Sequence, residues 1–314
     1  MNYVMNITTP INFHLLAFSK SEEHYHIIFI GLLLMYLLAL VGNMMIIVLV
    51  CLVSQLHTPM YFFLCNLAFQ DIISVSAFLP KLMAITITGD TSISFSDCIT
   101  QLFLLIFSAC ADFFLLAIMA YDRYVAICVP LRYHLIMSPR FCVLLVTASW
   151  IICATNAMCY SLFISHVSFC RLFDINYIFC ESKYMVEISC SDTTHIQTLV
   201  TINTLLVGIL SIGLILTSYV YIIYTILKIE TSAARLKTFS NCSSHLTVVL
   251  LFGGSGTSLY MKPNSENSQE IDKMLSLMYL GFIPMLNPLV YSLRNRQVHS
   301  AVKTVLTKYI LNAI

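Results

Sequence analysis

Long apolar stretches separated by short polar segments dominate the chain, and seven of these stretches are nearly free of charged residues. A helix rises about 1.5 Å per residue, so roughly 20 apolar residues cross the hydrocarbon core of a bilayer. Each of the seven stretches is long enough to do so. They comprise residues 27–53, 58–80, 98–121, 141–170, 193–227, 238–261 and 274–293.

Helices are the expected conformation of all seven stretches. Backbone groups find no water inside a bilayer, so a helix must satisfy them internally. Strands of a membrane barrel would alternate polar and apolar residues, and these stretches do not. The pattern predicts an all-α membrane protein, a seven-transmembrane helix bundle. We expect residues 1–26 to form an extracellular tail, 27–293 the seven-helix domain, and 294–314 a cytoplasmic amphipathic helix and tail.

Composition and charge agree with a membrane protein. Hydrophobic residues make up 59% of the chain and charged residues 10%, whereas soluble domains carry about 25% charged residues. The net charge of +1 gives no reason to expect nucleic acid as a partner.

The loop charges predict that the N-terminus lies outside the cell. In this orientation ten of the 16 Lys and Arg residues lie on the inner side and six on the outer side, as the positive-inside rule favours. Asn6 begins an Asn-Ile-Thr glycosylation triplet that is usable only in the lumen. Such a triplet also occurs by chance, so it supports the orientation only alongside the charges.

Four cysteines fall outside the membrane in this orientation, in an oxidising compartment that permits disulfides. Four cysteines allow three pairings, and their spacing does not choose among them. They are Cys98, Cys170, Cys180 and Cys190.

The last segment is predicted to form a short helix on the inner membrane leaflet. Its apolar residues recur at helical spacing, with Lys and Arg between them that anionic lipid would attract. A solvated tail is the alternative. The apolar positions are Val298, Ala301, Val302, Val305, Leu306 and Tyr309.

Four motifs stand at the inner ends of the predicted helices. They read LHTPMYFFL at 56–64, MAYDRYVAIC at 119–128, KTFSNCSSHL at 237–246 and PMLNPLVYSLRN at 284–295. In their order and placement they resemble the motifs of rhodopsin-like (class A) G-protein-coupled receptors, and among those the olfactory receptors. The resemblance implies a plasma-membrane odorant receptor that binds small, mostly apolar ligands and activates a stimulatory heterotrimeric G protein, which raises cyclic AMP.

The resemblance also implies a switch at the cytoplasmic face. Asp122 would hold Arg123 in a resting pose, and release would free the guanidinium to meet the G protein. Pro288 would create a hinge because it lacks a backbone N–H. Tyr219 and Tyr291 could instead be interface anchors. The switch residues are Asp122, Arg123, Tyr124, Tyr219, Asn287, Pro288 and Tyr291.

Asp71 and Asp112 are the only charged residues within the predicted spans. Alignment on the motifs places both in the core near Asn287, where two carboxylates cannot both ionise cheaply. One would hold a proton, or a cation would sit between them, and the resemblance implies a sodium ion. Satisfaction by hydroxyls and water is the alternative. No other cofactor is expected.

The resemblance implies two disulfides, Cys98 with Cys180 and Cys170 with Cys190, which would hold a long outer loop over the bundle as a lid. The implied ligand pocket contains no charged side chain, so a cationic amine is not expected as ligand. Packing is the alternative role for its aliphatic members. The pocket residues are Leu105, Ile106, Ala109, Cys110, Asn203, Val207, Gly256, Tyr260 and Leu280.

One position departs from the family pattern. The family usually has Phe-Tyr-Gly in the middle of helix six, and this chain has Phe252-Gly253-Gly254. The aromatic side chain expected to touch the ligand is therefore missing.

Other functions fit the sequence less well. A retinal protein needs a lysine in helix seven, and residues 274–293 contain none. A transporter would show repeats or several intramembrane charges, and no metal-spaced or nucleophile motif indicates an enzyme. A class A receptor for a non-odorant small molecule is the main alternative.

Overall fold

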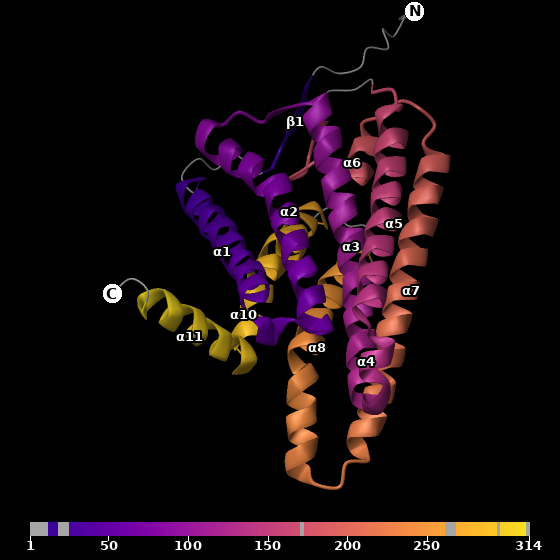
Figure 1. The fold of residues 1–314 in the computed structure, drawn as a ribbon. Coiled ribbons are helices and arrows are strands. Elements are labelled where there is room, and N and C mark those ends of the chain that lie inside the picture. Colours follow the sequence, from indigo (N-terminus) through magenta and orange to yellow (C-terminus); the bar gives the residue numbers. More distant parts are fainter. Residues whose placement is uncertain (1–11, 18–24, 170–172, 261–267, 294–295, 312–314) are drawn as a thin grey trace, which may run out of the picture.

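The protein is described by a computed structural model that covers residues 12–17, 25–169, 173–260, 268–293 and 296–311. Its long helices run side by side as a bundle, with small strands at one end and a short helix lying across the other (Figure 1). The helices are α1 Tyr25–Leu52, α2 Pro59–Thr88, α3 Phe95–Cys128, α4 Tyr133–Ile136, α5 Pro139–Ser165, α6 Ser182–Glu187, α7 Thr194–Leu227, α8 Ser232–Tyr260, α9 Ser268–Leu277, α10 Ile283–Leu293 and α11 Arg296–Leu311. Short helical turns lie at Ser54–Leu56 (η2), Pro130–Arg132 (η3) and Met278–Phe282 (η4).

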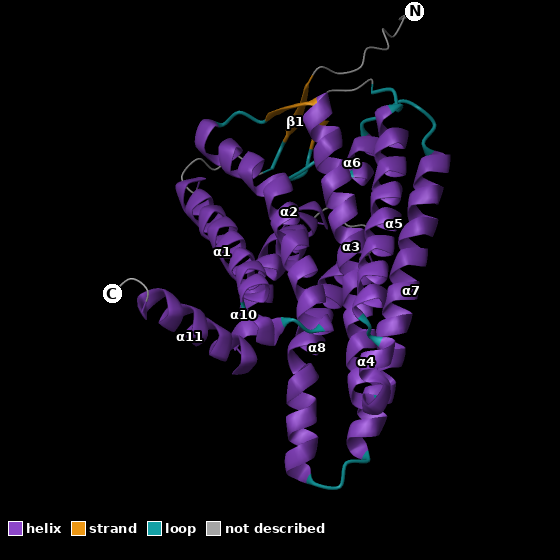
Figure 2. Cartoon of the chain, viewed as in Figure 1, coloured by secondary structure: helices purple, strands orange, loops and turns teal. Residues whose placement is uncertain are grey.

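The predicted seven-helix bundle is confirmed. Six of the described spans are long and apolar enough to cross a membrane, with α9, η4 and α10 forming one continuous span. The seventh is α8, whose described apolar run Cys242–Gly254 is shorter. Figure 2 shows that helix accounts for nearly all of the bundle.

The ends of α2 and α3 follow local chemistry. Helix α2 starts at Pro59, whose missing N–H is harmless in a first turn. It continues eight residues beyond the predicted end at Pro80 and stops at Gly89, which has a left-handed φ of 68°. The prediction stopped early because Lys81 is charged, but its ammonium lies at the outer end and donates to the Asp90 carbonyl at 3.3 Å. Helix α3 is capped by Ser94, whose Oγ accepts from the Asp97 N–H at 3.1 Å.

The seventh span contains a π-helical turn, η4, just before two prolines. Pro284 and Pro288 lack the N–H that would bond the carbonyls of Leu280 and Pro284. Side chains from other helices replace those donors. Ser74 Oγ donates to the Leu280 carbonyl at 3.5 Å, and Asn43 Nδ2 donates to the Pro284 carbonyl at 2.9 Å. Neither carbonyl is therefore left without a donor inside the bundle. The hinge at Pro288 stays a prediction.

A three-stranded sheet covers the extracellular end, in the order β2-β1-β3. Strand β1 (Asn12–Leu15) pairs antiparallel with β2 (Ser92–Ser94) and parallel with β3 (Asp174–Ile175). The Phe13 ring is fully buried and packs against Phe95, Phe169 and Phe173, at centroid distances of 5.2–6.2 Å. The extracellular tail predicted for residues 1–26 therefore contains a strand anchored to the bundle, which the sequence analysis did not predict.

Helix α11 has the predicted amphipathic pattern, but its first turns dock on protein. Val298 and Ala301 are buried, and Gln297 Oε1 accepts from the Tyr61 hydroxyl at 2.8 Å. Figure 1 shows α11 lying across the inner end of the bundle beside α1. Contact of this helix with lipid stays a prediction.

Candidate functional site

The cytoplasmic end of α3 holds an ion pair in which Asp122 is completely buried. Arg123 donates to Asp122 Oδ2 through Nη2 and through Nε, the latter at 3.0 Å. The other carboxylate oxygen, Oδ1, accepts from the Tyr133 hydroxyl of α4 at 2.8 Å. Burial and the neighbouring Asp122 raise the pKa of Tyr133, so this hydroxyl stays protonated and remains a donor. Asp122 therefore holds Arg123 against its own helix.

His245 connects three helices beside this ion pair. Its Nε2 lies 3.1 Å from the Leu116 carbonyl of α3, and its Nδ1 lies 2.7 Å from the Tyr219 hydroxyl of α7. A carbonyl only accepts, so Nε2 carries the proton and Nδ1 accepts from Tyr219. Sequence reasoning missed this residue. A histidine within the uncharged run 238–261 was the available signal.

Tyr291, a predicted switch residue on α10, lies at the same end of the bundle. Its ring is buried, and its hydroxyl has no hydrogen-bond partner among the described residues. The Ser244 hydroxyl ties α8 to this span by donating to the Val290 carbonyl at 3.0 Å. Tyr124 instead packs its ring toward Tyr221 of α7, at a centroid distance of 5.7 Å. The structure thus gathers Asp122, Arg123, Tyr219 and Tyr291 at one end of the bundle.

The two intramembrane carboxylates lie together in the core, near Asn287 as predicted. Asn287 Nδ2 donates to Asp71 Oδ2 at 2.9 Å, whereas Asp112 Oδ1 is buried without a hydrogen-bond partner among the described residues. Asp71 and Asp112 are close enough for their charges to repel. The site thus has one carboxylate oxygen whose bonding is unsatisfied.

The extracellular lid is fixed to α3 by the disulfide Cys98–Cys180, as the resemblance implied. Gln101 adds to this anchor, because its Oε1 accepts from the Cys180 N–H at 2.8 Å and its Nε2 donates to the Ala77 carbonyl at 2.9 Å. Cys190 is also disulfide-bonded. The predicted partner Cys170 lies outside the described residues, so that pairing stays a prediction. The glycosylation site predicted at Asn6 lies outside them as well.

Helix α9 contacts the lid through polar side chains. Lys273 Nζ donates to the Leu16 carbonyl at 3.2 Å and to Asn176 Oδ1 at 2.9 Å. The Tyr177 hydroxyl donates to the Asp272 carbonyl at 3.1 Å. The N-terminal strand, the long outer loop and the seventh span are thereby joined at the bundle mouth.

The predicted ligand residues divide between two packed regions. Leu105 and Leu280 are buried in the outer core with Ile106 against them, whereas Cys110 packs with Cys153 and Val207 farther along α3. Ala109 is half-buried on the same helix. The side chains at Gly256 and Tyr260 lie outside the described residues. Their role in binding stays a prediction.

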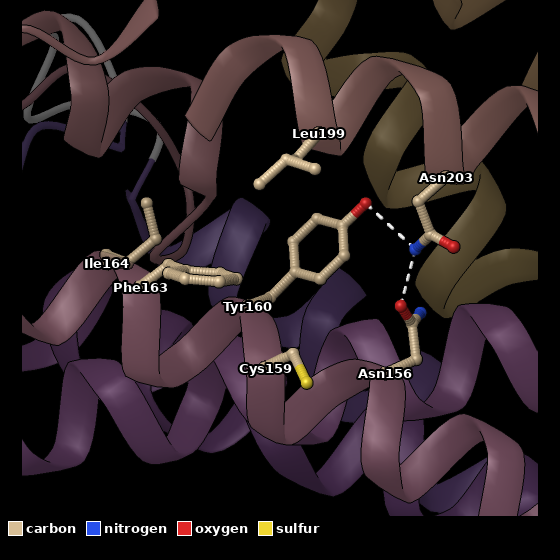
Figure 3. A pocket seen from close by; sticks show the side chains of 7 residues that line it. All are labelled: Asn156, Cys159, Tyr160, Phe163, Ile164, Leu199 and Asn203. Atoms are coloured by element: carbon tan, nitrogen blue, oxygen red, sulfur yellow. Dashed lines mark hydrogen bonds between the residues drawn. The ribbon is translucent and has the colours of Figure 1, made fainter. Parts of the chain in front are cut away.

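A cavity of about 160 Å³ lies between α5 and α7 (Figure 3). Asn203 is the predicted ligand residue that lines it, and its Nδ2 donates to Asn156 Oδ1 and, at 3.1 Å, to the Tyr160 hydroxyl. Sequence reasoning missed the α5 side, because Asn156 and Tyr160 occur singly in an apolar run. The lining residues are Asn156, Cys159, Tyr160, Phe163, Ile164, Leu199 and Asn203.

Comparison with known proteins identifies the family. The olfactory receptor family model matches residues 32–309. The chain belongs to the olfactory receptor family. It is 41% identical to olfactory receptor 1G1 of Gorilla gorilla gorilla and 42% identical to olfactory receptor 1 of Rattus norvegicus, over 96% of each chain. It is 39% identical to olfactory receptor 1F1 of Homo sapiens over 98% of each chain.

Family membership establishes the general activity of this olfactory receptor. It is an odorant-binding, G-protein-coupled receptor and not an enzyme, and it is a multi-pass membrane protein. The non-odorant alternative is not supported.

The lid of this olfactory receptor contains one carboxyl group with an unusual pKa. Burial raises the pKa of Glu181 from 4.5 to about 7. The nearby Lys183 opposes this shift, whereas Asp272 and Glu187 add to it. Tyr184 packs in the same group, with its hydroxyl 3.4 Å from Asp272 Oδ2. The folded lid therefore binds a proton more tightly than the unfolded chain does.

This shift predicts a pH-dependent stability. A raised folded-state pKa contributes stability below pH 4.5 that is lost as the pH rises through about 7. The purified receptor should unfold at a higher temperature at pH 5 than at pH 8. Between these two pH values Glu181 should change the free energy of unfolding by on the order of 1–3 kcal/mol. Glu181→Gln should remove this component, measured by thermal unfolding in nanodiscs. Glu230→Gln, an exposed glutamate between α7 and α8 that does not contact the lid, is the matched control. An equal pH dependence in Glu181→Gln and wild type would contradict the assignment.

Proposed function

We propose that this olfactory receptor binds small, mostly apolar odorants in the outer half of its bundle and activates a stimulatory heterotrimeric G protein at its cytoplasmic face. The observation that carries the coupling proposal is the buried Asp122, which holds Arg123 and is itself held by Tyr133. A guanidinium kept from solvent by one carboxylate is available to a partner once that contact is released.

Three interhelical contacts would transmit the signal from ligand to Arg123. A ligand that displaces α8 would strain the His245 bonds to Leu116 and Tyr219 and the Ser244 bond to Val290. Tyr219 and Tyr291 would then turn toward Arg123 in the active state. Activation in this scheme is a population shift between two bundle arrangements, driven by the ligand's higher affinity for one of them.

Exposed apolar side chains next to the ion pair support a protein partner on this face. Leu131 and Leu135 follow α3 in the cytoplasmic loop, with exposed fractions of 101% and 79%. Large apolar groups left exposed beside a charged switch are typical of protein contact sites. The G protein is the partner that the family implies for this surface.

A cation between the core carboxylates is a further part of this proposal. Among the described residues no three His, Cys, Asp or Glu side chains gather at one point, so Asp71 and Asp112 would hold a sodium ion together with neutral oxygens. The unpartnered Asp112 Oδ1 fits such an ion, because hard cations prefer oxygen ligands. Bound there, the ion would supply the positive charge that these two carboxylates lack.

An odorant screen tests the proposed coupling. Cells that express the receptor with an olfactory-type stimulatory G protein should raise cyclic AMP with at least one odorant of a broad panel. Arg123→Ala should abolish that response at equal surface level, whereas Arg140→Ala, an exposed arginine at the start of α5, should keep it. A response that survives Arg123→Ala would contradict the assigned switch.

Receptor that reaches the cell surface but responds to no odorant would make Gly253 the next position to change, because the family usually has an aromatic residue there. A Cβ atom built at Gly253 meets no atom within 4 Å, so a larger side chain can enter there without a backbone clash. Gly253→Tyr should then give a response by restoring the family's aromatic contact. If that variant is silent as well, the stimulatory coupling is wrong.

A further inference from the structure

The extracellular mouth of the bundle is closed by packed protein. Phe13, Leu15 and Ile175 in the small sheet are fully buried, as is Tyr177 beside them. The disulfide and the Lys273 bonds hold these elements over the helices. An apolar odorant prefers lipid to water, so a site that faces the bilayer is accessible to it without opening this lid.

The cavity between α5 and α7 opens on the outer surface of the bundle, which lipid would cover. Leu199 and Phe163 on its rim have exposed fractions of 52% and 49%, and Cys159 is exposed as well. Its volume of about 160 Å³ is close to the roughly 150 Å³ of an engineered protein cavity that binds benzene. The cavity therefore fits a molecule about the size of benzene.

Polar groups from both helices meet inside this apolar cavity. Figure 3 shows the Asn203 amide nitrogen between the Tyr160 hydroxyl and the Asn156 carbonyl oxygen, with the Asn203 oxygen turned away from both. That Oδ1 accepts no hydrogen bond from any described residue. An amide oxygen without a donor at membrane depth is costly, and a ligand that brings a hydroxyl would satisfy it.

The cavity is connected to α3 through Asn156. The Asn156 side chain also reaches the thiol of Cys110 on α3. Cys110 packs against Cys153 of α5 and Val207 of α7. Helix α3 continues without a break from this point to Arg123. Occupation of the cavity can thus alter the packing of the helix that carries the switch.

We propose that this membrane-facing cavity binds small alcohols and phenols that arrive through the lipid, with the ligand hydroxyl donating to Asn203 Oδ1. The hydrocarbon part fills the space between Phe163 and Leu199. The proposal rests on the odorant-receptor function, for which it names a ligand class and a route of entry. It predicts discrimination between ligands of equal size that differ only in whether they carry a donor.

Labelling of Cys159 tests the site without any signalling. The receptor in nanodiscs is treated with a membrane-permeant maleimide, and the labelling rate at each cysteine is followed by peptide mass spectrometry. Cyclohexanol should slow labelling of Cys159 by about fivefold relative to its isomer cyclopentyl methyl ether, the fold-change expected from one net hydrogen bond. Cys51, exposed on α1 and outside the cavity, should be labelled at the same rate with either compound.

Three variants make the test specific. Leu199→Trp should fill the cavity and abolish the difference between the isomers, whereas Leu205→Trp, a similarly exposed leucine outside the cavity on α7, should preserve it. Asn203→Leu should leave a cavity that no longer distinguishes alcohol from ether. Equal protection by both isomers in wild type, equal slowing at Cys51, or discrimination that survives Leu199→Trp would each overturn the proposal.

The labelling result is independent of the coupling result. Protection of Cys159 in a receptor that raises no cyclic AMP would contradict the stimulatory coupling and leave this site standing. A receptor that responds to odorants while cyclohexanol gives no selective protection would overturn the site and leave the coupling standing.

Discussion

Replacing Asp122 by Asn should raise the basal cyclic AMP level of this olfactory receptor in the absence of any odorant. The carboxylate is buried and holds Arg123 through charge-assisted bonds. Hydrogen bonds to charged groups contribute about 1.5–3 kcal/mol, so their loss shifts the resting-to-active ratio by roughly tenfold to a hundredfold. Cyclic AMP normalised to surface receptor is the measurement.

A graded series separates release of Arg123 from misfolding. Tyr133→Phe removes a single hydroxyl donor to Asp122 and should raise basal signalling less than Asp122→Asn does. Asp122→Glu keeps the charge and should stay near the wild-type level. Unchanged basal cyclic AMP in Asp122→Asn at normal surface abundance would show that this ion pair is not the restraint on activation.

Loss of the Cys98–Cys180 disulfide should greatly reduce the amount of folded receptor. The bond joins residues 82 positions apart, and a loop of that length contributes about 4.5 kcal/mol in the chain-entropy account. That is a large fraction of the stability typical of folded proteins. Surface labelling and thermal unfolding of Cys98→Ser are the measurements.

Two controls address the thiol left behind. The double variant Cys98→Ser with Cys180→Ser should be as unstable as the single one, because both lack the cross-link. Cys51→Ser, which removes an exposed free thiol on α1, should match wild type. A Cys98→Ser receptor with wild-type surface level and unfolding temperature would contradict this role for the disulfide.

Features encoded locally in the sequence could be predicted well. The seven apolar stretches located the helices, since length and lack of charge depend only on neighbouring residues. The motif around Arg123 predicted a switch, and the structure places Asp122 against it. Boundaries were less accurate: the search for uncharged residues stopped at Lys81, although α2 continues because that lysine lies at its outer end.

Features that depend on distant partners could not be predicted. Nothing near Phe13 indicates a strand, because β1 exists only where it pairs with segments about 80 and 160 residues later. The His245 bonds join residues from α3, α7 and α8. The cavity polar group likewise requires Asn156 and Asn203 to face each other across two helices.

The sequence by itself determined the membrane setting, the number and direction of the helices and the family, because hydrophobicity and contiguous motifs are local properties. Only the tertiary structure decided how the N-terminal strand closes the bundle, which donors replace those missing at Pro284 and Pro288, and that Asn156 and Asn203 bond across α5 and α7. Each of these depends on the distance between side chains that are remote in the chain, and packing of the helices fixes that distance.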